Sequence, residues 1–173
     1  MRASVFVGAS VDGFIARPDG AFDFLPDSPE PHGYEEFFAS VDALLMGRKT
    51  YETVLGFGGW PYGSKPVFVL SRKPLASVPE GAPIVRLSGS PQEVMAQLTS
   101  RGIGHVYVDG GQTVQQFLRA GLIDRITVTR VPVLIGSGIS IFGALDADVH
   151  LEHVATRTYP SGLVQSEYTV RPR

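Results

Sequence analysis

Over its first two thirds, the chain alternates short apolar runs with segments that are apolar on one side only. Runs of small and β-branched apolar residues predict buried strands, and apolar positions at helical spacing predict helices. Predicted strands cover 3–9, 42–46, 65–70, 83–87 and 105–108. Predicted helices cover 34–39, 48–55, a segment that opens at the capping box Ser90-Pro91-Gln92-Glu93, and 111–120. The stretch between Ser10 and Pro31 is rich in turn residues and is predicted to be a loop.

The last third lacks helical spacing and predicts strands only. They cover 124–131, 149–158 and 163–171, and Tyr159-Pro160-Ser161-Gly162 between the last two is typical of a hairpin turn. Alternating strands and helices followed by strands alone predict one α/β domain. We expect a mixed, mostly parallel central sheet with helices on both faces and an antiparallel C-terminal hairpin.

Composition narrows the possible classes of protein. The 173 residues suit one domain, 43% of them are hydrophobic, and the formal net charge is −2, which does not favour nucleic acid. There is no cysteine, and His32, His105, His150 and His153 show no ligand spacing, so we expect no metal site. No apolar run approaches the ~18 residues of a membrane span. We expect a cytoplasmic protein, because the chain enters a strand pattern directly after Met1-Arg2.

Three of the predicted strands end in short turns rich in glycine, hydroxyl and basic residues. These turns are Gly47-Arg48-Lys49-Thr50, Leu70-Ser71-Arg72 and Asp109-Gly110-Gly111-Gln112-Thr113. In open α/β sheets, ligands bind outside the carboxyl ends of the strands, and a helix N-terminus attracts an anion. The turns therefore suggest a cofactor with several phosphates, although each alone is also typical of an ordinary surface turn.

Together with two further segments, these turns resemble the dihydrofolate reductase superfamily. The resemblance is closest to the branch of the bacterial riboflavin-biosynthesis reductase domain, and it runs from about Val5 to the final strand. Its motifs are Met46–Glu52, Val69–Arg72, Val106–Gly111, Ser10–Ala16, and Pro132–Gly138 ahead of Phe142-Gly143. No G-x-G-x-x-G sequence is present, so a Rossmann fingerprint is not supported.

The resemblance implies NADPH as hydride donor beside a flat substrate. The cofactor-binding residues that it implies are Gly8, Ile15, Ala16, Gly47, Arg48, Lys49, Thr50, Leu70, Ser71, Arg72, Gly110, Gly111, Gln112 and Thr113. Among these, Ser71 and Arg72 would meet the 2′-phosphate. Both glycine-containing turns after 46 and 109 would hold the pyrophosphate, and the Gly110–Gly111 peptide is expected to be cis, as is frequent in the superfamily.

Three residues are candidates for catalysis. Thr129 matches a position that faces the substrate pocket in the family. Asp109 lies at the end of its strand and would reach the space between nicotinamide and substrate, or it would cap the next helix. Asp12 would line the pocket, or it would only form an Asp-Gly turn.

One departure from folate reductases concerns the acid that protonates the pterin ring. Within Pro31–Phe37, Gly33 falls at the matching place, while Glu35 and Glu36 lie too late. We therefore expect an NADPH-dependent reductase of a small heterocycle or carbonyl compound. Alternatives are a weak dihydrofolate reductase, a reductase of ribosylated pyrimidines and a non-catalytic NADP(H)-binding protein. A homodimer is expected through the apolar, glycine-rich stretch 131–142.

Overall fold

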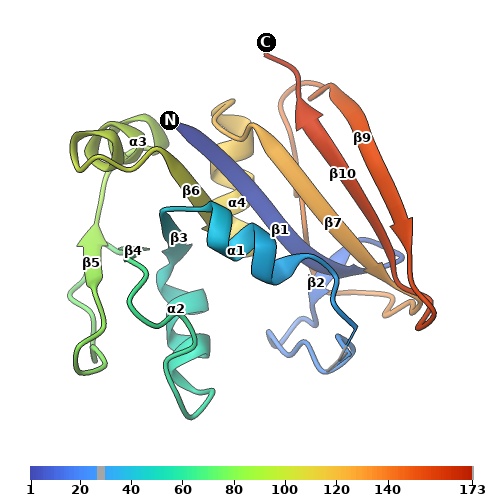
Figure 1. The fold of residues 1–173 in the computed structure, drawn as a ribbon, viewed down its shortest axis with the longest axis horizontal. Helices are drawn as coiled ribbons and strands as arrows, with labels where there is room; N and C mark the ends of the chain where they lie inside the picture. Colours follow the sequence, from blue (N-terminus) through green and yellow to red (C-terminus); the bar gives the residue numbers. More distant parts are fainter. Residues whose placement is uncertain (27–29, 173) are drawn as a thin grey trace.

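A single twisted sheet of eight strands runs through the molecule. The computed structural model describes residues 1–26 and 30–172, and its sheet has the strand order β5-β4-β3-β6-β1-β7-β10-β9 (Figure 1). The strands are β1 (Arg2–Ser10), β3 (Ala43–Gly47), β4 (Val67–Leu70), β5 (Ile84–Leu87), β6 (His105–Asp109), β7 (Arg125–Val131), β9 (Leu151–Thr158) and β10 (Val164–Val170). The helices are α1 (Tyr34–Ser40), α2 (Arg48–Leu55), α3 (Pro91–Ser100) and α4 (Gly111–Arg119).

The predicted fold class is confirmed. The strands from β5 across to β7 are parallel to their neighbours, while β10 pairs antiparallel with both β7 and β9. The tight turn after Tyr159 joins β9 to β10, and the Ser90–Glu93 capping box opens α3 as expected. The parallel arrangement places the carboxyl ends of β1, β3, β4 and β6 at one edge of the sheet.

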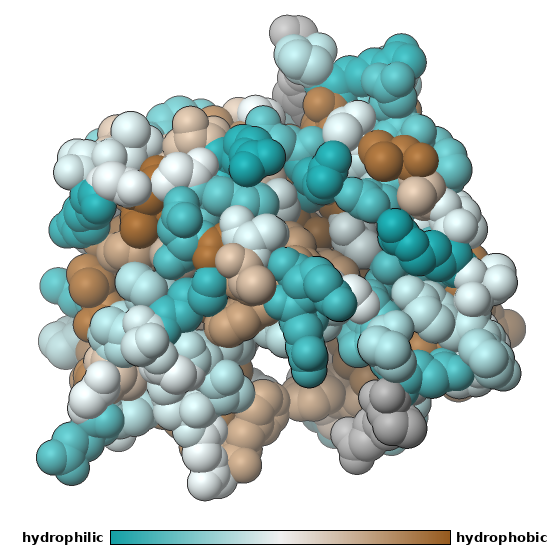
Figure 2. All heavy atoms as spheres, viewed as in Figure 1, coloured by the Kyte–Doolittle hydropathy of each residue, from teal (hydrophilic) through white to brown (hydrophobic). Residues whose placement is uncertain are grey.

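The sheet carries a separate apolar core on each face. On one face, α3 and α4 bury residues such as Leu98 and Phe117 against β1, β3 and β6. On the other, α1 and α2 cover β3, β4 and β6 with aromatic residues, among them Phe37 and Tyr51. In Figure 1 α1 lies in front of the sheet, and Figure 2 shows that this side is mostly hydrophilic, with hydrophobic residues scattered among the polar ones.

Two details differ from the sequence-based expectation. The predicted loop after Ser10 contains β2 (Phe14–Ala16), which pairs with β8 (Ile139–Ser140) in a small second sheet; part of that loop, 27–29, lies outside the described residues. Such short strands have too few residues to show an alternating pattern. The expected cis peptide is also wrong, because every described peptide bond, Gly110–Gly111 included, is trans. The turn is made instead by the positive φ of Gly110, which is 87°.

No helix among residues 1–26 and 30–172 has the length and apolar character needed to cross a membrane. Across the same residues, no three histidine or acidic side chains gather closely enough to hold a metal ion.

Candidate functional site

The three predicted turns meet at one edge of the sheet. Strand β3 lies between β4 and β6, with Gly47 paired to Leu70 and Met46 paired to Asp109. The residues that follow these strand ends are therefore side by side, although more than 60 positions separate the first turn from the last. This arrangement brings Arg48, Ser71 and Gly110 to the same edge.

Helices α2 and α4 begin in close contact at that edge. A Cβ added to Gly110 would lie 2.2 Å from Oγ1 of Thr50, and one added to Gly47 would lie 3.0 Å from Oγ1 of Thr113. Thr50 of α2 therefore packs against Gly110, which precedes α4, and Thr113 of α4 packs against Gly47, which precedes α2. Glycine is required at 110 both for this space and for the positive φ.

Neither of these two helices has a side-chain cap. Their N-cap residues are Gly47 and Gly110, which have no side chain to bond the N–H groups of the first turn. By contrast, Ser90 and Glu93 form a full capping box at the start of α3. The first N–H groups of an uncapped helix and its positive dipole end attract anions. Two such helix starts in contact form a cradle for a group with two negative charges, such as a pyrophosphate.

The turn after β4 adds positive charge next to this cradle. Arg72 is exposed, and Arg86 of β5 donates from Nη1 to the Ser71 carbonyl oxygen at 3.1 Å. The sequence analysis missed Arg86, because only the pairing of β4 with β5 brings it there. The Ser71 hydroxyl is engaged within its own turn, donating to the Lys73 carbonyl at 2.7 Å, and Arg48 pairs with Glu52 at 2.8 Å.

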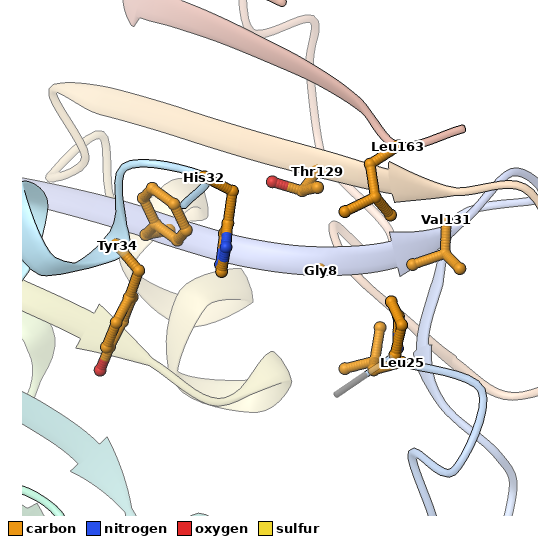
Figure 3. A pocket seen from close by; sticks show the side chains of 9 residues that line it. Gly8, Leu25, His32, Tyr34, Thr129, Val131 and Leu163 are labelled. Atoms are coloured by element: carbon orange, nitrogen blue, oxygen red, sulfur yellow. The ribbon is translucent and has the colours of Figure 1, made fainter. Parts of the chain in front are cut away.

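A cavity of about 240 Å³ opens on the α1 face beside the carboxyl ends of β1 and β7. Its lining residues are Phe6, Gly8, Leu25, Pro26, His32, Tyr34, Thr129, Val131 and Leu163. Figure 3 shows His32 and Tyr34 on one side, and Leu25, Val131 and Leu163 on the other, with Gly8 on the strand between them. The cavity lies below the ~300–1,000 Å³ of drug-sized ligand sites and suits a ligand of one or two rings.

Two of the polar residues at this cavity were not predicted from the sequence. The ring of His32 lies 5.9 Å from that of Phe6, centroid to centroid, and its Nδ1 contacts the Glu30 carbonyl at 3.1 Å. Gln165 of β10 donates from Nε2 to Thr129 Oγ1 at 2.9 Å and to the His32 carbonyl at 2.8 Å. No sequence signal singles out either residue, since both roles depend on which segments pack together.

Asp109 lies at the end of β6, within electrostatic range of Tyr34, Tyr62 and Tyr107. Burial raises the pKa of its carboxyl group, against the opposing effects of the N–H of Gly110, which donates at 2.8 Å, and of the Tyr107 hydroxyl. Burial, assisted by the nearby carboxylate, also raises the pKa of Tyr34 to about 12. The carboxyl group is therefore held in a setting that favours its protonated form. Asp109 does not line the cavity itself, but its charge acts on Tyr34, which does line the cavity.

The remaining predicted residues lie in three places. Ile15 and Ala16 lie on β2, and a Cβ on Gly111 would lie 2.8 Å from Cδ1 of Ile15, so β2 covers the glycine pair. Asp12 is exposed and lies outside the cavity, where it accepts hydrogen bonds from the N–H groups of Ile135 and Gly136, at 3.3 and 2.7 Å. This placement matches the alternative that it is a structural turn residue. Lys49 and Gln112 lie in the first turns of α2 and α4.

The acid of folate reductases has no counterpart at the start of α1. Gly33 precedes the helix with φ 81° and brings no side chain to the cavity. Glu35 and Glu36, which follow on the helix, are exposed. Among the described lining residues, the titratable groups are the imidazole of His32 and the phenol of Tyr34.

Comparison with known proteins identifies the family. The model of the RibD C-terminal domain matches residues 4–165, nearly the whole chain. This chain belongs to the RibD C-terminal domain family. The resemblance inferred from the sequence motifs is thereby confirmed.

Solved structures agree with this assignment. The chain is similar to a putative riboflavin biosynthesis protein from Shewanella sp. PV-4, at 36% identity over 99% of each chain and a TM-score of 0.89. It is also similar in fold to a Thermotoga maritima diaminohydroxyphosphoribosylaminopyrimidine deaminase/5-amino-6-(5-phosphoribosylamino)uracil reductase. That match has 17% identity and a TM-score of 0.76, and it covers 99% of this chain and 56% of the Thermotoga chain. A dihydrofolate reductase from Enterococcus faecalis, complexed with NADP(H), shares the fold at 19% identity and a TM-score of 0.66, over 98% of this chain and 96% of its own. This member of the RibD C-terminal domain family therefore has a dihydrofolate reductase-like fold.

Proposed function

We propose that this member of the RibD C-terminal domain family is an NADPH-dependent reductase of a small, uncharged heterocyclic or carbonyl compound. The observation that carries the proposal is the pair of uncapped helix starts, α2 and α4, in contact at the strand ends beside a cavity. The cradle fits the pyrophosphate of a dinucleotide, and Arg72 and Arg86 suit its 2′-phosphate. When bound, NADPH would supply a hydride.

In this proposal the chain's own residues orient the reactants and move a proton. Gly8 leaves space at the cavity floor, where an added Cβ would lie 3.0 Å from Leu25. Asp109 is proposed as the proton source, because burial raises the pKa of its carboxyl group and so favours the protonated form that reduction of a C=O or C=N group requires.

The cavity favours an uncharged substrate over a phosphorylated one. None of its nine described lining residues is a lysine or an arginine. A phosphate would need such groups, since isolated anions are costly to bury. This supports a substrate without the ribose phosphate that the name of the Thermotoga enzyme contains. A weak folate reductase is less favoured, because Gly33 offers no acid.

Two measurements test the proposal in sequence. Binding at 100 times Kd stabilises a protein by about 2.7 kcal/mol, so saturating NADPH is expected to raise Tm by about 5–11 °C, and NADH at the same concentration by less. NADPH oxidation is then followed over pterins, flavin precursors and simple carbonyl compounds. No shift with NADPH refutes the proposal, while a shift without turnover on any compound supports the non-catalytic alternative.

We also propose a homodimer, as expected from the sequence. Within 131–142, Leu134 is 71% exposed and Ile139 is 37% exposed, so this stretch presents apolar side chains that a second copy of the chain would bury. Sedimentation equilibrium on the parent and on Leu134→Asp tests this directly. A parent that sediments at the 18.6 kDa of one chain refutes the dimer.

A further inference from the structure

Gln165 is a buried amide that makes two hydrogen bonds at the back of the cavity. It is 3% exposed, and the antiparallel register of β7 and β10 sets it directly opposite Thr129. Its Nε2 lies 2.8 Å from the carbonyl oxygen of His32 and 2.9 Å from Oγ1 of Thr129. A carbonyl oxygen can only accept, so the atom that faces it must be the NH2 group of the amide. Both protons of that group are therefore engaged.

This orientation of the amide determines whether the Thr129 hydroxyl donates or accepts its hydrogen bond to Gln165. Because the amide nitrogen only donates, Oγ1 accepts from it and the hydroxyl proton remains available. Thr129 makes no second side-chain hydrogen bond among the described residues. The side chain itself is restricted, since it is β-branched and only 6% exposed. Figure 3 shows its oxygen turned toward the side of the cavity that carries His32.

The geometry points to Gln165 as the positioning residue that presents Thr129 to the substrate as a hydrogen-bond donor. The cavity would then select a ring with a carbonyl oxygen next to the Thr129 hydroxyl. The inference rests on the proposed function and specifies its substrate class. The surrounding walls are largely apolar, formed by Phe6, Leu25 and Leu163 among others. In such a setting a substrate group that leaves a buried donor unpaired is penalised, so one hydroxyl is sufficient to discriminate.

A thermodynamic cycle on pteridine binding tests the inference. The probe is 2,4-dioxopteridine, a flat two-ring lactam, and its Kd is measured by isothermal titration calorimetry without cofactor. Thr129→Val keeps the shape and removes the hydroxyl, and it is expected to weaken binding about 3- to 10-fold; Thr129→Ser is expected to bind like the parent. Gln165→Glu replaces the amide with a carboxylate that takes the hydroxyl proton, so we expect a loss at least as large.

The decisive variant is the double substitution. If Gln165 acts through the hydroxyl, Gln165→Glu is expected to add less than about twofold to the loss in Thr129→Val. A merely structural role would produce the same loss in both backgrounds, and that result overturns the inference. So does a parent that fails to bind the pteridine, or a Gln165→Glu variant that binds it like the parent.

Two controls keep the result interpretable. Gln97→Glu makes the same chemical change on α3, where Gln97 donates to the Ser88 carbonyl, and it is expected to leave pteridine binding unchanged. If Gln165→Glu does not fold, Gln165→Met enters the same cycle. NADPH affinity is measured separately on each protein: a parent that binds the pteridine but not NADPH refutes the proposed function and leaves the role of Gln165 standing.

Discussion

Replacing either glycine of the 110–111 pair with alanine is expected to have very different effects on folding. At 110, the new Cβ would lie 2.2 Å from Thr50 Oγ1 and 3.2 Å from its Cβ, with the backbone at φ 87°. At 111, the nearest atom is Cδ1 of Ile15 at 2.8 Å, the end of a flexible side chain, and φ is not positive. Alanine is therefore expected to disturb the fold much more at 110 than at 111.

The magnitude follows from two separate penalties at 110. A non-glycine residue in the sparsely populated region at φ 87° and ψ 132° costs about 1–3 kcal/mol, and forcing an extra atom into a packed site costs about 1–3 kcal/mol. Gly110→Ala is therefore expected to lower the free energy of unfolding by about 2–6 kcal/mol, or Tm by roughly 4–24 °C. Gly111→Ala is expected to cost about 1 kcal/mol, because Ile15 can shift.

Urea titrations measure both penalties when a matched control is included. Gly102 has φ 81° with nothing within 4 Å of an added Cβ, so Gly102→Ala reports the backbone penalty alone. Adding Thr50→Ala to Gly110→Ala should recover part of the packing penalty. The reasoning is refuted if Gly110→Ala loses no more stability than Gly102→Ala, since α2 and α4 would then not meet as described.

Three further predictions concern ligands and pH. Arg72→Ala is expected to weaken NADPH binding about 10- to 150-fold and leave NADH nearly unchanged, with Arg101→Ala just after α3 as control; equal Kd values of the parent for both cofactors contradict this. Asp109→Asn is expected to lower turnover about 10²- to 10⁴-fold. Because burial raises the pKa of Asp109, the contribution of this group to stability is full below the ordinary aspartate pKa and is lost as pH rises through the raised value, so Asp109→Asn should melt higher than the parent at pH 8. Dihydrofolate is expected to turn over below about 1 per second, and a stopped-flow rate within the ordinary range of about 1–10³ per second would refute this.

The sequence by itself determined the elements and the chemistry of their ends. Apolar spacing is a local property, so it predicted the strands and helices of the main sheet, and the Ser90–Glu93 box predicted the start of α3. The glycine and basic residues after β3, β4 and β6 predicted a phosphate site for the same reason, because each turn contains its own donors.

Only the tertiary structure decided which of these ends meet and what faces the cavity. Strand order depends on how distant segments pack, and this brought Arg86 beside Ser71 and Thr50 against Gly110. The pairing of β7 with β10 placed Gln165 behind Thr129, across 36 positions of sequence. Burial, which no local pattern measures, raised the pKa of Asp109. The local sequence shows which chemical groups follow each strand. Long-range packing determines which partners those groups have and how far they are removed from water.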